Sequence, residues 1–231
     1  MKKIVITGGL GYIGMELCKI YSGQSRTKNI TVIDNKFHSS RVEQLKRWGI
    51  KYRQIDILDS NNLNKEINDA DIIYHLAGIS DVATVKEDIN INHEKLVFAV
   101  GVEGTRNIIN LSSESAKIVF PSTHVIFEGL KKVKFNIDET HEPSPVLDYA
   151  KGKLESENDL IKSNKNFVIL RLGSLYGKSF DSTRLNIMPN LFAKISSFNG
   201  KITLYSGGKQ LKSLVSINDV VRCMELSLIH I

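Results

Sequence analysis

The chain has 231 residues, of which 42% are hydrophobic and 24% are charged, and its formal net charge is +6. This length can bury one substantial core, and the composition is that of a globular protein, which excludes an intrinsically disordered chain. Lysine and arginine are scattered, with no run longer than a pair such as Lys131-Lys132. The charge therefore favours a solvated basic surface over a nucleic-acid partner, and it suits an anionic small-molecule substrate.

The two cysteines and the apolar segments limit the class of protein further. Neither Cys18 nor Cys223 has a CxxC partner, so we expect no disulfide framework and no zinc or other metal site. No apolar stretch approaches the roughly 20 residues of a membrane span, and the N-terminus runs directly into a predicted strand, which does not fit a signal peptide. We expect a cytoplasmic protein with no membrane partner.

Short β-branched segments alternate with amphipathic segments from the start of the chain. Strands are expected at residues 4–6, 30–33, 52–55, 71–76, 117–121 and 167–172, and helices at residues 12–21, 42–48, 95–111 and 147–163. This alternation, with strands that are apolar throughout, is typical of a parallel sheet covered on both faces. Right-handed crossovers then leave a doubly wound, Rossmann-like α/β fold as the economical topology.

The pattern loosens after Gly177. A helix is expected at residues 185–196, strands at residues 201–204 and 214–217, and a last helix from residue 218. We therefore predict a Rossmann domain at residues 1–175 and a small, incomplete substrate-binding subdomain at residues 176–231, interleaved with the Rossmann core.

The turn after the first strand carries a dinucleotide-binding pattern. Gly8, Gly11 and Gly14 let the backbone turn sharply and approach a pyrophosphate, which the N-terminus of the following helix would bind. The second strand ends in Asp34, whose carboxylate can accept hydrogen bonds from the adenosine ribose and would repel a 2′-phosphate. Asn35 follows it, where an NADP site would favour Arg. The sequence therefore predicts NAD as the cofactor.

Tyr149 and Lys153 are four residues apart in a predicted helix, so both side chains project from one face. A phenol with a pKa of about 10 is a poor base, but a neighbouring ammonium and a positive nicotinamide favour the phenolate. Lys153 can also hold the nicotinamide ribose. Tyr149 is then expected to take or give a hydroxyl proton while a hydride moves to or from NAD.

The GxxGxxG spacing of these glycines resembles the extended short-chain dehydrogenase/reductase family, which includes NAD-dependent epimerases and dehydratases, and the resemblance extends over nearly the whole chain. The segment from His75 to Gly78 and the segment from Gly101 to Thr105 match family segments, although Gly101 replaces the usual Asn. We predict that His75 is a packed strand-end histidine without chemistry. The resemblance implies that Asp56 and Ile57 contact the adenine. The predicted cofactor-binding residues are Gly8, Gly11, Tyr12, Ile13, Gly14, Asp34, Asn35, Asp56, Ile57, Leu76, Ala77, Gly78 and Lys153.

The stretch from Ser122 to Gly129 resembles the family segment that supplies a catalytic hydroxyl. The resemblance places Thr123 at the position that hydrogen-bonds the substrate oxygen, with Ser122 as the neighbouring candidate. Sugar 4,6-dehydratases of the family carry Asp-Glu directly after this Thr, whereas this chain has His124-Val125. Dehydration by that mechanism is therefore disfavoured. His124 is either an unusual acid/base or, as we favour, a strand-end histidine with a structural hydrogen bond.

The same resemblance suggests the substrate contacts. The segment from Asn186 to Pro189 is similar to a diphosphate-contacting segment of UDP-galactose 4-epimerases, and Lys212 stands where the family has a phosphate-binding Arg. Lysine keeps the charge but loses the bidentate fork. Ser174 replaces the usual substrate-side Asn. We therefore predict Asn186, Lys212 and Ser174 as substrate-binding residues.

Three functions fit these motifs. We favour a redox-neutral epimerase of a sugar or nucleotide-sugar, acting by transient oxidation of a hydroxyl carbon. The alternative is a net oxidoreductase, a keto-sugar reductase or sugar dehydrogenase, because residues 122–129 also resemble dTDP-4-dehydrorhamnose reductases. A non-catalytic NAD-binding regulator is the third. Relatives often pair through the helices beside the Tyr149 unit, which suggests a homodimer. Family members run well past 231 residues, so we expect a C-terminally truncated chain.

Overall fold

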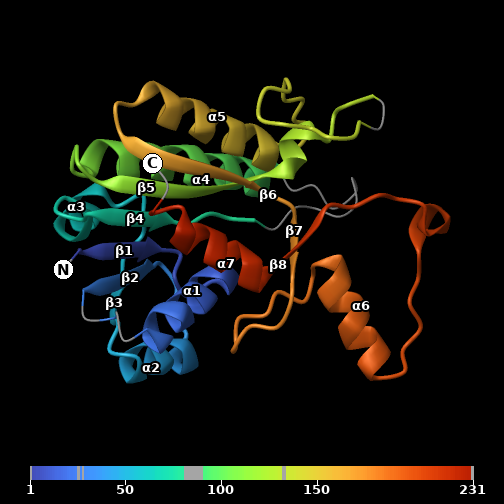
Figure 1. Ribbon diagram of the computed structural model, residues 1–231, viewed down its shortest axis with the longest axis horizontal. Coiled ribbons are helices and arrows are strands. Elements are labelled where there is room, and N and C mark those ends of the chain that lie inside the picture. Colours follow the sequence, from blue (N-terminus) through green and yellow to red (C-terminus); the bar gives the residue numbers. More distant parts are fainter. Residues whose placement is uncertain (1, 25–26, 28, 81–90, 132–133, 230–231) are drawn as a thin grey trace.

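The computed structural model describes residues 2–24, 27, 29–80, 91–131 and 134–229. Its centre is a six-stranded sheet in the order β3-β2-β1-β4-β5-β6, in which every strand pair is parallel (Figure 1). The strands are β1 (Ile4–Thr7), β2 (Ile30–Asp34), β3 (Lys51–Gln54), β4 (Ile72–His75), β5 (Lys117–Thr123) and β6 (Asn166–Leu172). The order reverses between β1 and β4, as in a doubly wound sheet. The predicted Rossmann-like fold is therefore confirmed.

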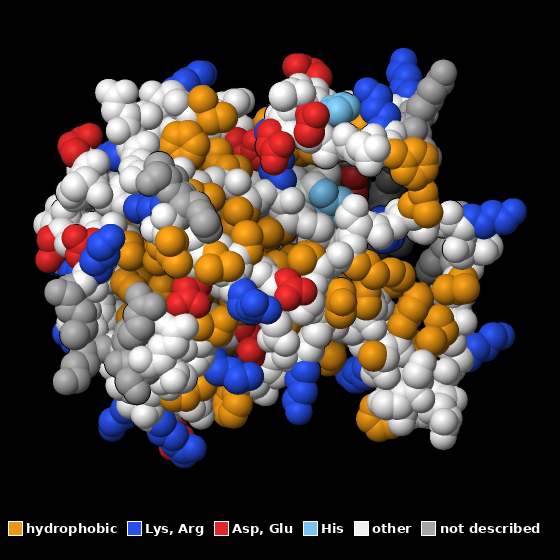
Figure 2. Space-filling view, viewed as in Figure 1, with side chains coloured by type: hydrophobic (Ala, Val, Ile, Leu, Met, Phe, Trp, Pro, Cys, Tyr) orange, Lys and Arg blue, Asp and Glu red, His pale blue; other side chains and the backbone are white. Residues whose placement is uncertain are grey.

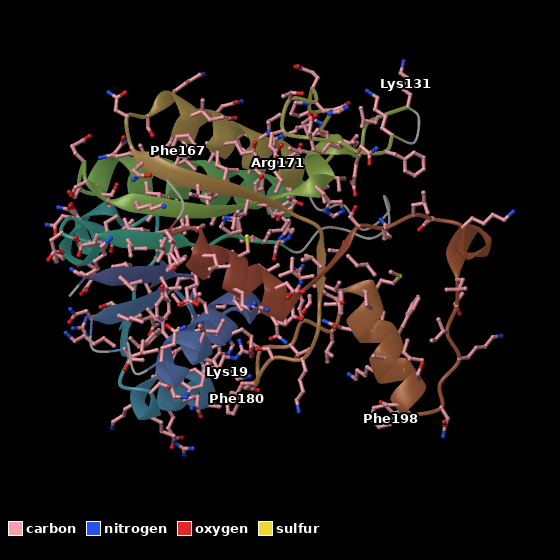
Figure 3. All side chains as sticks on the ribbon, in the orientation of Figure 1. Lys19, Lys131, Phe167, Arg171, Phe180 and Phe198 are labelled. Carbon is pink, nitrogen blue, oxygen red and sulfur yellow. The ribbon has the colours of Figure 1, made fainter. Side chains whose placement is uncertain are left out.

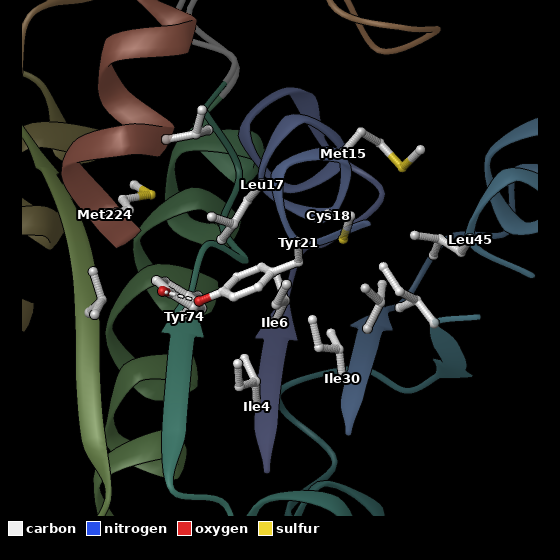
Figure 4. Close-up of a cluster of buried hydrophobic side chains, with 14 of the residues drawn as sticks. Ile4, Ile6, Met15, Leu17, Cys18, Tyr21, Ile30, Leu45, Tyr74 and Met224 are labelled. Atoms are coloured by element: carbon white, nitrogen blue, oxygen red, sulfur yellow. Dashed lines mark hydrogen bonds between the residues drawn. The ribbon is translucent and has the colours of Figure 1, made fainter. Parts of the chain in front are cut away.

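Helices cover both faces of this sheet because successive strand side chains point to opposite faces. Ile4 and Ile6 contribute to the core under α1, α2 and α7, whereas Val5 contributes to the core under α3, α4 and α5. The close-up of the first core shows the buried Tyr21 and Tyr74 joined by a hydrogen bond of 2.7 Å between their hydroxyls (Figure 4). The helices are α1 (Tyr12–Gly23), α2 (Ser39–Arg47), α3 (Ser60–Ile67), α4 (Ile91–Leu111), α5 (Asp148–Lys162) and α7 (Ile217–Leu226).

The segments after β6 form a smaller unit beside the sheet. β7 (Ser174–Tyr176) and β8 (Leu214–Ser216) pair in parallel, and α6 (Met188–Ser197) lies to one side of them (Figure 1). The chain then returns to the Rossmann core, because Val220, Val221 and Met224 of α7 are buried in the same cluster as α1. The division at residues 175 and 176 remains a prediction.

Two local predictions need correction. The strand expected at residues 201–204 is absent, since this mostly exposed segment has no regular structure and pairs with no strand in the described part of the chain, and an unpaired strand leaves its backbone groups unsatisfied. Conversely, α3 was not predicted, because its sequence is polar apart from two buried residues. A local signal exists: the Asp59 side chain accepts a hydrogen bond of 3.1 Å from the Asn62 N–H, an N-cap.

The surface agrees with the scattered charge of the sequence. Lys and Arg side chains are dispersed among acidic and uncharged groups over the face seen in Figure 2. Within the described residues, no helix is both long and apolar enough to cross a membrane.

Candidate active site

The turn between β1 and α1 brings backbone close to backbone. Gly8 has a φ of +65°, and a Cβ atom there would lie 2.6 Å from the Ala77 nitrogen. A Cβ atom on Gly14 would lie 2.5 Å from the Gly9 Cα. Only glycine fits both positions. The turn therefore presents bare backbone to the space above the sheet, beside the residues that follow β4.

Asp34 is fixed next to this turn. One carboxylate oxygen accepts the Leu10 N–H at 3.1 Å, and the other accepts the Lys36 N–H at 3.1 Å. Asn35 donates from its side chain to Asp56 at 3.1 Å. The end of β2 thus holds a carboxylate within reach of a ligand that lies on the glycine turn.

A cavity of about 890 Å³ runs along the carboxyl edge of the sheet, where open α/β sheets bind their ligands. Most of the predicted site residues line it: Gly8, Gly11, Tyr12, Ile13, Gly14, Asp34, Asn35, Leu76, Ala77, Gly78, Ser122, Thr123, Tyr149, Lys153, Ser174 and Asn186. Asp56, Ile57 and Lys212 are not among the lining residues. Ile57 is buried against α4, and Lys212 is exposed. The roles predicted for the lining residues and for these three all remain predictions.

Tyr149 and Thr123 meet in this cavity from different elements. Tyr149 stands in the first turn of α5, Thr123 ends β5, and their side chains are hydrogen-bonded. Burial raises the pKa of Tyr149, while the charge of Arg184 and the Thr123 hydrogen bond oppose this rise. The charge of Arg184, a residue outside the sequence motifs, therefore favours the ionised phenol, and the role predicted for Lys153 stays a prediction. The Tyr149 hydroxyl is thus the group of this pair that can donate or accept a proton.

Lys153 contacts the strand end rather than the phenol. Its ammonium donates to the Pro121 carbonyl at 2.9 Å and lies 4.3 Å from the centroid of the Phe120 ring. Burial lowers the pKa of Lys153 to about 8, and the neighbouring Glu157 carboxylate opposes this shift. Lys153 thus joins α5 to β5 at the edge of the cavity.

Ser122 is engaged on the other side of β5. Its hydroxyl donates to the Glu157 carboxylate, which is buried and which Arg171 also binds, with Nη2 at 2.8 Å and Nε at 3.1 Å from one oxygen. Arg171 comes from β6 (Figure 3). Of the two hydroxyls that the sequence offered, Thr123 contacts Tyr149, whereas Ser122 belongs to this buried network.

The two histidines near the strand ends differ. His75 is buried, with Nδ1 at 2.9 Å from the Thr7 hydroxyl and Nε2 at 3.1 Å from the Thr105 hydroxyl. The predicted packed histidine is therefore confirmed. His124 lines the cavity, and its Nδ1 lies 3.0 Å from the Leu172 carbonyl.

Helix α1 holds the segment that completes the cavity wall. The Tyr12 hydroxyl donates to the Gly177 carbonyl, and Glu16 accepts hydrogen bonds from the Ser179 hydroxyl at 2.8 Å and the Phe180 N–H at 3.1 Å. Phe180 accordingly lies near Lys19 of α1 (Figure 3). Helix α1, which follows the glycine turn, is therefore hydrogen-bonded to residues 177–180.

Two arginines outside the sequence motifs also line the cavity. Arg184 donates to the side-chain carbonyl oxygen of Asn186 at 2.9 Å and to the Ser80 hydroxyl at 2.6 Å. Arg41 donates to the backbone carbonyls of Leu10 and Asp181, each at 2.8 Å. Neither belongs to a motif, so only their contacts across the fold identify them.

In the described part of the chain, no group of three or more His, Cys, Asp or Glu side chains could hold a metal ion.

Comparison with known proteins shows the family of the chain. The family model described as "NAD dependent epimerase/dehydratase family" matches residues 4–231. The chain belongs to this family. Its members are enzymes that depend on NAD, so NAD is the cofactor of this epimerase/dehydratase-family protein, as the sequence predicted.

Individual relatives share about a quarter of their residues with this chain. The chain is 25% identical to a UDP-N-acetyl-alpha-D-glucosaminuronate decarboxylase of Bacillus cytotoxicus, with 95% of the chain and 69% of the relative covered. It is 25% identical to a dTDP-D-glucose 4,6-dehydratase of Dictyostelium discoideum (99% and 56% covered) and to a UDP-glucose 4-epimerase of Mycoplasma genitalium (99% and 70%). The chain thus spans between 56% and 70% of the length of these curated relatives.

Solved structures share the fold. A UDP-glucuronic acid 4-epimerase from Bacillus cereus, in complex with UDP-glucuronic acid and NAD, superposes with a TM-score of 0.80 at 22% identity, covering 98% of this chain and 73% of that one. A UDP-glucose 4-epimerase from Thermotoga maritima gives a TM-score of 0.80 at 21% identity, with 98% and 73% covered.

Proposed function

We propose that this protein is an NAD-dependent epimerase of a nucleotide-sugar, which inverts a carbon by transient oxidation of its hydroxyl, with Tyr149 as general acid/base. The observation that carries the proposal is the hydrogen-bonded Thr123–Tyr149 pair in a cavity continuous with the glycine turn. His124-Val125 follows Thr123, so the site lacks the carboxyl pair of the family's sugar dehydratases. Redox-neutral epimerisation needs no such pair.

The site fits NAD on its own geometry. The positive φ of Gly8 and the absence of room for a Cβ atom at Gly8 and Gly14 are expected where backbone approaches a pyrophosphate. Asp34 would bind the adenosine ribose, and Lys153 the nicotinamide ribose. When bound, NAD supplies the acceptor and donor of the hydride.

Side chains of the protein would then transfer the proton. Tyr149 Oη would take the proton of the substrate hydroxyl and later return it. Because burial keeps the pKa of this phenol above its ordinary value of 10.0, the bound cofactor and Arg184 must favour its ionised form. Thr123, which is hydrogen-bonded to Tyr149, would orient the same substrate oxygen.

The substrate would extend toward the second half of the cavity. Ser174 and Asn186 line that part, and we assign them to the sugar and the diphosphate. Lys212 is exposed and outside the cavity wall, so its contact with a diphosphate remains part of the proposal. A homodimer formed through α4 and α5, measurable by sedimentation, and a cytoplasmic location also belong to it.

Cofactor retention tests the proposal. Purified protein is denatured, and the released nicotinamide nucleotide is quantified. Near-stoichiometric NAD or NADH supports an epimerase, whose cofactor need not leave between turnovers. A site that is empty but binds added NAD supports the net oxidoreductase, which residues 122–129 also suggest. Protein that neither retains nor binds NAD contradicts both.

A substitution tests the role of the phenol. Tyr149→Phe should lower turnover by about 10²–10⁴-fold, the usual contribution of general acid/base catalysis, and should leave NAD affinity nearly unchanged. An equal loss of turnover and NAD affinity would contradict the assigned role.

A further inference from the structure

We propose that His124 contacts the substrate through Nε2 and selects a hydroxyl group next to the reacting carbon. This inference rests on the proposed function, since it places the reacting carbon at Tyr149. His124 would then determine substrate specificity, which a purely structural histidine would not do.

The position of His124 is fixed by the catalytic hydroxyl beside it. His124 is the first residue of the 3₁₀ helix η2 (His124–Phe127), and Thr123 caps this helix by accepting the Val125 N–H at 3.2 Å. The same Thr123 side chain is hydrogen-bonded to Tyr149. His124 therefore directly follows Thr123, the residue that would bind the substrate oxygen, and it lines the same cavity.

A hydrogen bond to a carbonyl fixes the protonation of the ring. Nδ1 of His124 lies 3.0 Å from the backbone oxygen of Leu172, at the end of β6. A carbonyl oxygen only accepts hydrogen bonds, so Nδ1 must carry the proton. In the neutral imidazole, Nε2 is then the acceptor. Among the residues that the structure describes, none is hydrogen-bonded to Nε2.

An acceptor at this place selects a donor. Leu172 and Thr123 both line the cavity, so the His124 ring bridges the ends of β6 and β5 on the cavity wall. A sugar hydroxyl that covers His124 can donate to Nε2, whereas a deoxygenated carbon in the same place would exclude water and leave this acceptor unpaired. The substrate is thus a sugar with a free hydroxyl on the carbon next to the one whose hydroxyl proton Tyr149 transfers.

Two variants separate this role from a structural one. His124→Asn retains an amide N–H near the Nδ1 position, where it can donate to Leu172, but it has no atom at the Nε2 position. His124→Gln can reach the Nε2 position but loses the donor near Nδ1. A histidine that only ties η2 to β6 would tolerate Asn and not Gln. A substrate contact predicts the reverse order for sugar binding.

The experiment has two readouts on NAD-loaded protein. Long-range ¹H–¹⁵N NMR, with the His124 signals identified by their loss in His124→Asn, should show the Nδ1–H tautomer. Calorimetry should then compare UDP-glucose with UDP. We expect His124→Asn to weaken UDP-glucose binding by at least tenfold (the order of one lost hydrogen bond), with UDP and NAD affinity unchanged, and His124→Gln to retain part of the sugar-dependent affinity.

Several results would overturn the inference. The Nε2–H tautomer would place the acceptor on the wrong nitrogen. Unchanged UDP-glucose binding in His124→Asn, or an equal loss for UDP and UDP-glucose, would show that Nε2 does not contact the sugar, and the proposed function would survive either result. Wild-type protein that binds NAD but no sugar nucleotide would overturn the proposed function and this inference together.

Discussion

The burial of His75 makes the stability of the protein sensitive to acid. This histidine is 1% exposed, and both ring nitrogens lie within hydrogen-bonding distance of threonine hydroxyls. Burial, with a smaller effect of the Lys153 charge, lowers the pKa of His75 from 6.5 to about 3. The folded protein therefore keeps this ring neutral at pH values where the unfolded chain binds a proton.

The sign and size of the effect follow from linkage. Because the folded-state pKa lies below the unfolded value, the stabilisation is fully present above about pH 6.5 and is lost progressively as the pH falls toward about 3. Each pH unit within this window corresponds to about 1.4 kcal/mol. Between pH 7 and pH 5, His75 should therefore lower the free energy of unfolding by about 2 kcal/mol, which corresponds to about 4–8 °C in Tm for a chain of this size.

Urea unfolding at pH 7 and at pH 5 measures this contribution. His75→Asn should be less stable than wild type at pH 7, because it loses packing and an optimised hydrogen bond. Its further loss between pH 7 and pH 5 should, however, be smaller than that of wild type by about 2 kcal/mol. His38→Asn, at an exposed position, is the matched control and should keep the wild-type loss. The reasoning is refuted if His75→Asn loses as much stability between the two pH values as wild type.

Three further predictions test the cofactor turn and the network behind the site. Asp34→Ala should relax the preference for NAD over NADP at least tenfold in binding assays, since the carboxylate no longer repels a 2′-phosphate; an unchanged preference would mean that the ribose lies elsewhere. Gly8→Ala should abolish NAD binding and cost about 1–3 kcal/mol in urea unfolding, because of its positive φ and the neighbouring backbone. Gly101→Ala, where a Cβ atom meets open space within a helix, should stabilise slightly, and a similar loss in both variants would argue against the clash. Glu157→Gln should cost about 3–5 kcal/mol in the same assay by leaving Arg171 without its carboxylate; a loss below about 1 kcal/mol would show that the pair is solvated.

The sequence by itself determined the parts of the protein that depend on neighbours along the chain. The strands, their order of alternation with helices and the glycine turn are local patterns, because burial on both faces imposes apolar strands and a pyrophosphate site imposes glycine. The spacing of four residues in α5 placed Tyr149 and Lys153 on one face of the helix. Family resemblance then added Thr123, and the fold, the family and the cofactor followed.

Only the tertiary structure decided the contacts between distant segments. It brought Arg184 close enough for its charge to act on Tyr149, and it placed the Ser122 hydroxyl against the Glu157 carboxylate. It also left residues 201–204 without a strand partner. None of these outcomes has a local signature, because a hydrogen bond or an ion pair between residues tens of positions apart exists only once packing has fixed where both elements lie.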